Sequence, residues 1–171
     1  VAKGIATLAG SLERLIKKEK ITSADRDAAL ARIKGSTNYE DLKSSQLVIE
    51  AATENHDLKV KILKQIDAIV PADVIVASNT SSISITKLAA MTSRPDRFIG
   101  MHFFNPVPMM ALVEIIRGLQ TSDATYEAVQ SMAVALGKTP VTVKNSPGFV
   151  VNRILVPMIN EAFFVLYEGL A

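Results

Sequence analysis

One of the two histidines in this chain of 171 residues lies in an apolar segment that also contains a carboxylate. The segment MHFFNPVPMMALVEI (101–115) has Glu114 twelve residues after His102, with Pro106 and Pro108 between them. The two prolines disrupt strand pairing and favour a loop that returns the chain to the sheet. A carboxylate in an apolar strand is costly to bury unless it is paired, and His102 is the nearest candidate partner. Such a pair could perform general acid–base chemistry.

Two structural interpretations of the same residues stay open at this point. A lone histidine in an apolar run is often a satisfied core residue, and a buried glutamate can be satisfied by backbone amide groups. His102 and Glu114 are therefore either an acid–base pair or two independent structural residues.

The elements that must position these side chains alternate between strands and helices. Short apolar runs predict strands at residues 47–52, 74–79, 97–103, 112–118 and 139–144, the first two buried on both faces. Helical spacing predicts helices at residues 57–70, 84–91 and 123–137, with Pro71 and Gly137 as stop signals. This alternation predicts an α/β fold with a parallel, doubly wound sheet.

Helical segments flank the alternating part. Residues 1–20 and 25–33 have apolar residues at helical spacing, and Thr22 with Asp25 is a plausible capping box, so we expect a helical hairpin with a basic tip at about residues 1–35. Ser146-Pro147-Gly148 interrupts the pattern, and the strongly apolar residues that follow are expected to be helical. We therefore expect one domain at residues 1–146 and the start of an α-helical domain at 147–171.

Polar residues follow three of the expected strands. Ligands of open α/β sheets bind outside the carboxyl ends of the strands, so we expect these groups to converge on one edge. For Ser81 and Ser82 the alternative is that they cap the next helix, and Asn152 could simply be a polar residue in the first turn of the terminal helix. The residues concerned are Thr53, Glu54, Asn55, Thr80, Ser81, Ser82, His102 and Asn105, with Asn152 and Arg153 at the start of the terminal helix.

Composition excludes several classes of function. Apolar residues make up 49% of the chain and charged residues 21%, and the net charge of +2 is too small to favour nucleic acid as a partner. The absence of cysteine excludes disulfides and thiolate chemistry and is compatible with a reducing cytoplasm. No apolar run reaches the roughly 18 residues of a transmembrane helix, and no signal-peptide pattern is present. We expect a cytoplasmic protein with no membrane or metal site.

Four segments of the chain resemble the L-3-hydroxyacyl-CoA dehydrogenase family, including its bacterial 3-hydroxybutyryl-CoA members. They are SNTSS (78–82), MHFFNPVP (101–108), LVEII (112–116) and SPGFVVNR (146–153), in the order and with the spacing of the family. The resemblance covers essentially the whole chain. It implies a Rossmann-like, mostly parallel sheet, NAD as the cofactor, and reversible hydride transfer at C3 of a (3S)-3-hydroxyacyl-CoA such as 3-hydroxybutyryl-CoA.

The resemblance also implies a role for individual residues. His102 matches the catalytic base, Glu114 its paired carboxylate, and Ser81 the serine that binds the substrate oxygen. Asn152 matches the asparagine that helps to hold the substrate and its developing charge. Positions that match contacts to the cofactor are Glu54, Lys59, Asn105 and Ser81, and positions that match contacts to coenzyme A are Ser11 and Lys18. For Lys17 and Lys20 a solvated helix face is the preferred interpretation.

The chain departs from the family in one respect. The family opens with a strand and a GxGxxG turn that holds the pyrophosphate of NAD, and no GxGxxG motif occurs in these residues. We therefore expect the chain to begin after the first strand–helix unit and to end inside the C-terminal helical domain, through which the family forms homodimers.

Three functions follow from these observations. The first is an NAD-dependent 3-hydroxyacyl-CoA dehydrogenase, represented by an internal segment. The second is a non-catalytic fragment or dimerisation module of that enzyme, because half of the cofactor site is missing. The third is the dehydrogenase part of a multifunctional fatty-acid oxidation protein.

Overall fold

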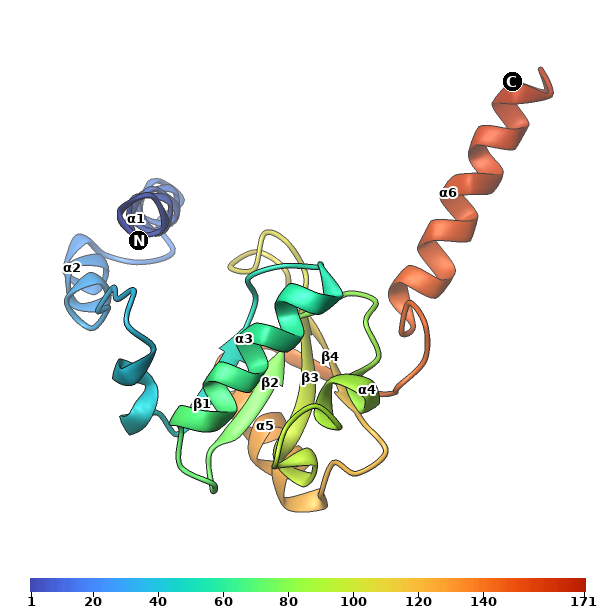
Figure 1. Ribbon diagram of the computed structural model, residues 1–171. Coiled ribbons are helices and arrows are strands. Elements are labelled where there is room, and N and C mark those ends of the chain that lie inside the picture. The colour runs from blue at the N-terminus through green and yellow to red at the C-terminus, as the bar shows by residue number, and fades with distance from the viewer. The chain divides into compact units, whose positions relative to one another are not determined.

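The computed structural model describes all 171 residues, which divide into two compact units, Val1–Asp41 and Leu42–Ala171 (Figure 1). The first unit is the expected helical hairpin, made of α1 (Ala2–Lys17) and α2 (Ser23–Ala31). The Thr22 hydroxyl accepts a hydrogen bond from the Asp25 amide while the Asp25 side chain accepts one from the Thr22 amide, so the predicted capping box is confirmed. The Arg26 guanidinium on α2 forms an ion pair with Glu13 on α1 and joins the two helices.

The second unit is built on a five-stranded sheet. Its strands are β1 (Leu47–Glu50), β2 (Ile75–Ser78), β3 (Phe98–Phe103), β4 (Leu112–Arg117) and β5 (Thr139–Lys144), in the order β1-β2-β3-β4-β5. Neighbouring strands are parallel except for β3 and β4, which are antiparallel. A short loop joins β3 to β4, and such a connection can return the chain only in the antiparallel direction, whereas a parallel pair needs a longer crossover.

Helices cover both faces of this sheet (Figure 1). The helices of the unit are α3 (His56–Ile69), α4 (Ile85–Ala89), α5 (Asp123–Ala135) and α6 (Val151–Tyr167), with short 3-10 turns at Tyr39–Ser44 and Pro95–Arg97. On one face α5 packs Val129 and Ala133 against buried residues of β2, β3 and β4, namely Ala77, Ile99, Met101, Val113 and Ile115. The opposite face carries α3 and α4.

Close packing on the α4 face explains a glycine in β3. A Cβ atom at Gly100 would lie 2.9 Å from side-chain atoms of both Ile116 on β4 and Ile85 on α4. These distances are shorter than real contacts, so only glycine lets α4 approach the sheet this closely. Side chains alternate along a strand, and His102, two residues after Gly100, therefore points to this same face.

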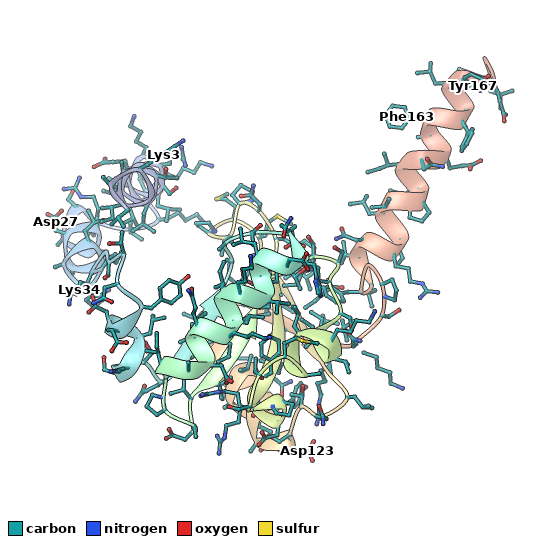
Figure 2. The ribbon with its side chains drawn as sticks, viewed as in Figure 1. Lys3, Asp27, Lys34, Asp123, Phe163 and Tyr167 are labelled. Carbon is teal, nitrogen blue, oxygen red and sulfur yellow. The ribbon has the colours of Figure 1, made fainter.

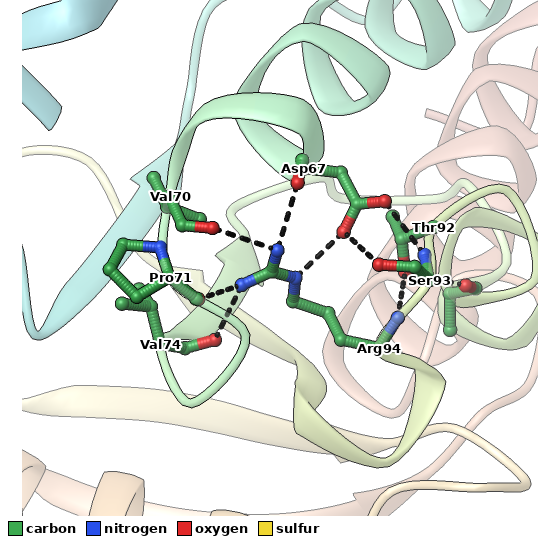
Figure 3. A network of polar contacts seen from close by, with 8 residues as sticks. Asp67, Val70, Pro71, Val74, Thr92, Ser93 and Arg94 are labelled. Carbon is green, nitrogen blue, oxygen red and sulfur yellow. Dashed lines mark hydrogen bonds and ion pairs between the residues drawn. The ribbon is translucent and has the colours of Figure 1, made fainter. Parts of the chain in front are cut away.

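The buried residue Arg94 binds the C-terminal end of α3 (Figure 3). Its guanidinium binds the Asp67 side chain at 2.7 Å and donates to backbone carbonyl groups at and just beyond the end of the helix. The last carbonyl groups of a helix have no partner within the helix, and Arg94 donates hydrogen bonds to those of Asp67 and Val70. The carbonyl groups belong to Asp67, Val70, Pro71 and Val74.

The predicted elements are confirmed, but the sheet is mostly parallel and not wholly parallel as the alternation predicted, because β3 and β4 are antiparallel. Two further details differ. Ile49 on β1 is 40% exposed, so this strand is not buried on both faces as expected, whereas the predicted burial of β2 is confirmed. The polar residue Ser84, and not Ser81 or Ser82, caps α4 by accepting a hydrogen bond from the Lys87 amide.

The terminal helix α6 buries none of its residues. Large apolar side chains run along its length, including those of Phe163 and Tyr167 (Figure 2). None of the helices combines the length and the hydropathy needed to cross a membrane. The domain boundary at residue 146 stays a prediction.

Candidate active site

The two residues singled out by their spacing face each other across an antiparallel strand pair. The register of β3 and β4 pairs His102 directly with Glu114, and Nδ1 of the imidazole lies 2.7 Å from Oε2 of the carboxylate. Both residues are buried, at 6% and 1% exposure. At such burial a carboxylate must be compensated, and the imidazole N–H provides part of that compensation.

The other oxygen of Glu114 holds the start of α6. Oε1 accepts hydrogen bonds from the backbone amides of Val150 and Val151, each at 3.0 Å. The first amide groups of a helix have no partner within the helix and favour a negative charge. The structure therefore contains both alternatives for Glu114, because one oxygen pairs with His102 and the other accepts backbone amides.

This arrangement fixes the orientation of the imidazole ring. An ionised carboxylate only accepts hydrogen bonds, so the network assigns the proton to Nδ1 and leaves Nε2 as an acceptor. Nε2 makes no hydrogen bond within the protein, and it is not fully enclosed, because every fully enclosed nitrogen or oxygen atom of a buried side chain has a partner. The ring contacts two phenylalanines, with centroids 4.6 Å from Phe104 and 5.6 Å from Phe149.

Asn152 and Ser81 lie together beside this pair. Asn152 is the second residue of α6, and its Nδ2 lies 3.5 Å from the carbonyl oxygen of Ser81. Ser81 follows β2, in the loop before α4. Since Glu114 holds the amide of Val151, the residue before Asn152, one carboxylate connects His102 with the helix that carries Asn152.

The carboxyl ends of β1 and β2 meet as expected. The Thr80 hydroxyl donates to Oε2 of Glu54 at 2.8 Å, which joins the loop after β1 to the loop after β2. Glu54 is exposed, as is Asn105 in the loop after β3. The structure thus brings Glu54 and Thr80 into contact, and Asn105 follows β3 at the same end of the parallel strands.

Lys59, the remaining sheet-edge residue of the expected cofactor site, lies beneath this edge. It is 1% exposed, and its ammonium group pairs with Oε2 of the buried Glu50. The Ser78 hydroxyl donates to the same oxygen at 2.9 Å, and the Ala52 amide donates to Oε1 at 2.8 Å. Burial raises the pKa of Glu50, but the hydrogen bonds from Lys59, Ala52 and Ser78 outweigh it, so the pKa is lowered from its ordinary value.

Two residues of this edge were not expected from the sequence. Glu50 is a charged residue in a strand that is otherwise apolar, the same signal that pointed to Glu114. Asn79 follows β2 directly, and its side chain accepts a hydrogen bond from the amide of Phe103, next to His102. Nothing in the local sequence around Ser78 and Asn79 indicates a contact between Asn79 and β3.

The expected coenzyme A contacts, Ser11 and Lys18, belong to the other unit. Ser11 lies in α1, where its hydroxyl donates to the Thr7 carbonyl and accepts from Arg14. Lys18 is exposed at the C-terminal end of α1.

Residues 1–146 match the family model described as 3-hydroxyacyl-CoA dehydrogenase, NAD binding domain. The chain belongs to the 3-hydroxyacyl-CoA dehydrogenase family.

Relatives of known structure and name support this assignment to the 3-hydroxyacyl-CoA dehydrogenases. The chain is 77% identical to (S)-3-hydroxybutyryl-CoA dehydrogenase PaaH1 from Ralstonia eutropha, with a TM-score of 0.97, covering 100% of this chain and 60% of that one. It is 51% identical to a 3-hydroxybutyryl-CoA dehydrogenase of Bradyrhizobium diazoefficiens, covering 97% of this chain and 57% of the relative. It is also 44% identical to the fatty acid oxidation complex subunit alpha of Acinetobacter baylyi, covering 99% and 24%.

The chain thus spans about three fifths of the length of the curated 3-hydroxybutyryl-CoA dehydrogenases that it matches.

The donor set at the sheet edge fits one part of NAD. The exposed carboxylate of Glu54 can accept hydrogen bonds from ribose hydroxyl groups, and the amide of Asn105 can both donate and accept. These two exposed side chains therefore offer donors and acceptors of the kind that a ribose requires.

Proposed function

We propose that the protein is an oxidoreductase that transfers a hydride between NAD and C3 of a (3S)-3-hydroxyacyl-CoA, such as 3-hydroxybutyryl-CoA, to give the 3-oxoacyl-CoA. The observation that carries this proposal is the His102–Glu114 pair at 2.7 Å, with Nε2 free of any hydrogen bond within the protein. A base with one nitrogen held and the other free is the arrangement that proton transfer to a substrate requires. The names of the relatives point to the same substrate class.

In the oxidation direction, Nε2 of His102 accepts the proton of the C3 hydroxyl while C3 loses its hydride and the C3–O bond becomes a carbonyl. NAD, when bound, supplies the hydride acceptor. Glu114 stabilises the imidazolium that results and keeps the ring in the productive tautomer. In the reduction direction the same nitrogen returns the proton to the oxygen.

Ser81 and Asn152 are proposed to hold the substrate oxygen. A hydroxyl and an amide N–H directed at an oxygen that gains negative charge stabilise the transition state more than the ground state. The contact between Asn152 and the Ser81 carbonyl, together with the bonds from Glu114 to the start of α6, supports a joint role for the two residues.

The cofactor is proposed to bind at the carboxyl edge of β1–β3 through Glu54, Asn105, Ser81 and Lys59. Glu54 and Asn105 are exposed there and can bind ribose and nearby groups directly. Lys59 is proposed to support the cofactor site from beneath the edge, because its ammonium group is buried and paired with Glu50. Ser11 and Lys18 are proposed to contact coenzyme A, whose phosphates give a physical reason for the cation at Lys18.

Further proposals concern the domain organisation, the location and the context of the chain. The exposed apolar side chains of α6 support a domain boundary at residue 146, with residues 147–171 opening a helical domain that forms a homodimer. The cysteine-free composition supports the cytoplasm as the location. The match to a fatty acid oxidation complex subunit supports a multifunctional protein as the alternative context for the same activity.

The function is tested by NADH formation from (S)- and (R)-3-hydroxybutyryl-CoA with the full-length protein that carries this chain. We expect turnover of the (S) substrate and none of the (R) substrate. NADH formation from neither substrate, in a protein shown to be folded, would contradict the proposal. The alternative of a non-catalytic fragment is tested by calorimetric titration of residues 1–171 with NAD, since tight binding would exclude that alternative.

A further inference from the structure

Asn79 lies where the pairing of β2 with β3 ends. The parallel register of these strands stops at Ser78 and Gly100, two residues before His102. The last part of β3 is therefore paired with β4 on one side but has no backbone partner from β2 on the other. A strand end that is paired on one side only is free to shift unless another group holds it.

The side chain of Asn79 takes the place of the missing backbone partner. Its Oδ1 accepts a hydrogen bond from the amide of Phe103 at 2.9 Å. The backbone amide of Asn79 donates a hydrogen bond to the backbone carbonyl of Glu50 at 2.8 Å. Asn79 therefore connects the ends of β1, β2 and β3, and it holds β3 at the residue next to His102.

The partner of Asn79 on β1 is itself held firmly. The carboxylate of Glu50 is buried and accepts hydrogen bonds from the Lys59 ammonium group, the Ser78 hydroxyl and the Ala52 amide. A buried charge with this many partners is rigid, because moving it would leave several polar groups without compensation. The end of β3 is thus bound, through Asn79, to a residue whose side chain is buried and held by several hydrogen bonds.

The same residue also begins the loop that carries the substrate-binding groups. Thr80 and Ser81 follow Asn79 directly, and they contact Glu54 and Asn152 respectively. A movement of Asn79 would therefore change the distance between Nε2 of His102 and the side chain of Ser81. Misplacement of reacting groups by about 1 Å costs on the order of 100-fold in rate.

We propose that Asn79 is a positioning residue for the reaction, which holds His102 in register with Ser81 through its bond to the Phe103 amide. This inference rests on the proposed function. Asn79 itself is not proposed to contact the reacting atoms. Its role needs only an acceptor oxygen at Oδ1, which aspartate retains and alanine lacks.

Thr121 offers a matched control at the opposite end of the same strand. Its buried hydroxyl donates to the carbonyl of Phe98 at 2.7 Å and accepts from the amide of Gly118 at 2.9 Å. Thr121→Val removes these bonds without a change in shape. It weakens the beginning of β3, whereas Asn79→Ala weakens its end beside His102.

The test compares Asn79→Ala, Asn79→Asp and Thr121→Val in the full-length protein. We expect Asn79→Ala to lower kcat for NADH-linked reduction of acetoacetyl-CoA by about 10- to 100-fold, with KM changed less than about threefold. Hydrogen exchange of the Phe103 amide should become faster. Asn79→Asp should recover both quantities to within about threefold of the wild type, and Thr121→Val should lower the melting temperature while leaving kcat within about twofold.

Two results would overturn the inference. One is unchanged hydrogen exchange at Phe103 in Asn79→Ala, and the other is an equal loss of kcat in Asn79→Ala and Thr121→Val. If the wild-type protein shows no turnover, the proposed function fails. The exchange measurements on Phe103 in the alanine and aspartate variants then decide whether Asn79 holds the strand end.

Discussion

Glu114 lies directly opposite His102 in the β3–β4 pair, and its two oxygens bind different parts of the protein. Oε2 is 2.7 Å from the imidazole Nδ1, while Oε1 accepts the amides of Val150 and Val151 at the start of α6. One buried carboxylate therefore sets the orientation of the imidazole and holds the helix that carries Asn152.

Glu114→Gln separates the charge of the carboxylate from its shape. The amide can still accept hydrogen bonds from the start of α6 with its oxygen, but its NH2 group then faces Nδ1 and reverses the tautomer of His102. We expect kcat to fall by roughly 10²- to 10⁴-fold with a small change in stability. Steady-state kinetics and thermal unfolding measure both. Glu127→Gln, on an exposed position of α5, is the control, and an equal effect of the two substitutions on kcat would refute this role.

Arg94→Lys tests whether the guanidinium of Arg94 stabilises the C-terminal end of α3. The guanidinium makes several hydrogen bonds in a planar fork, and an ammonium group keeps the charge but cannot reproduce the fork. We expect the free energy of unfolding to fall by about 2 kcal/mol. Arg97→Lys is the matched control, because Arg97 donates a single bond, to the exposed carbonyl of Asp73 at 3.1 Å. Urea denaturation that finds no difference between the two variants would be inconsistent with this role of Arg94.

Glu50→Gln should change stability in a pH-dependent way. The pKa of Glu50 is lowered in the folded chain, where burial is outweighed by the hydrogen bonds from Lys59, Ala52 and Ser78. A lowered pKa means that the stabilisation is fully present above the pKa of the unfolded chain, about 4.3, and is lost as the pH falls through the folded value. The wild type should therefore be more stable than the variant at pH 7, and the difference should shrink as the pH falls from about 5 to 3. A difference that grows on acidification, in denaturation curves at each pH, would show the opposite linkage.

Gly100→Ala and Gly10→Ala should have opposite effects. The added methyl group at position 100 would meet Ile116 and Ile85 at 2.9 Å, so we expect a loss of about 1–3 kcal/mol from overpacking. At position 10, inside α1, the methyl group meets no atom within 4 Å, and alanine is the better helix former by about 0.5–1 kcal/mol. Melting temperatures that fall for the first and rise for the second agree with the packing described, and an unchanged value at position 100 does not.

Much of the fold follows from local patterns that the sequence carries directly. The capping box of Thr22 and Asp25, the stop of α3 before Pro71 and the alternation of strands and helices depend on neighbouring residues, and all are confirmed. The pairing of His102 with Glu114 was one of two interpretations that the prolines and the carboxylate left open, and the resemblance to the family favoured it.

Features that depend on distant parts of the chain were not predicted. The second oxygen of Glu114 binds amides 36 and 37 residues away, and Asn79 binds an amide 24 residues away, so no local spacing contains either contact. The burial of Lys59 also depends on Glu50 and Ser78 from two different strands. A lysine in an amphipathic helix is usually solvated, and only the tertiary structure shows that this one is not.

The central claim is that Nε2 of His102 transfers the substrate proton. It is tested most directly by the kcat of NADH-linked acetoacetyl-CoA reduction in His102→Ala, compared with His56→Ala, the same substitution at the other histidine, which is exposed at the start of α3. We predict that kcat falls by about 10²- to 10⁴-fold in His102→Ala and stays within about twofold of the wild type in His56→Ala. A His102→Ala variant that is folded and retains wild-type kcat would contradict the claim.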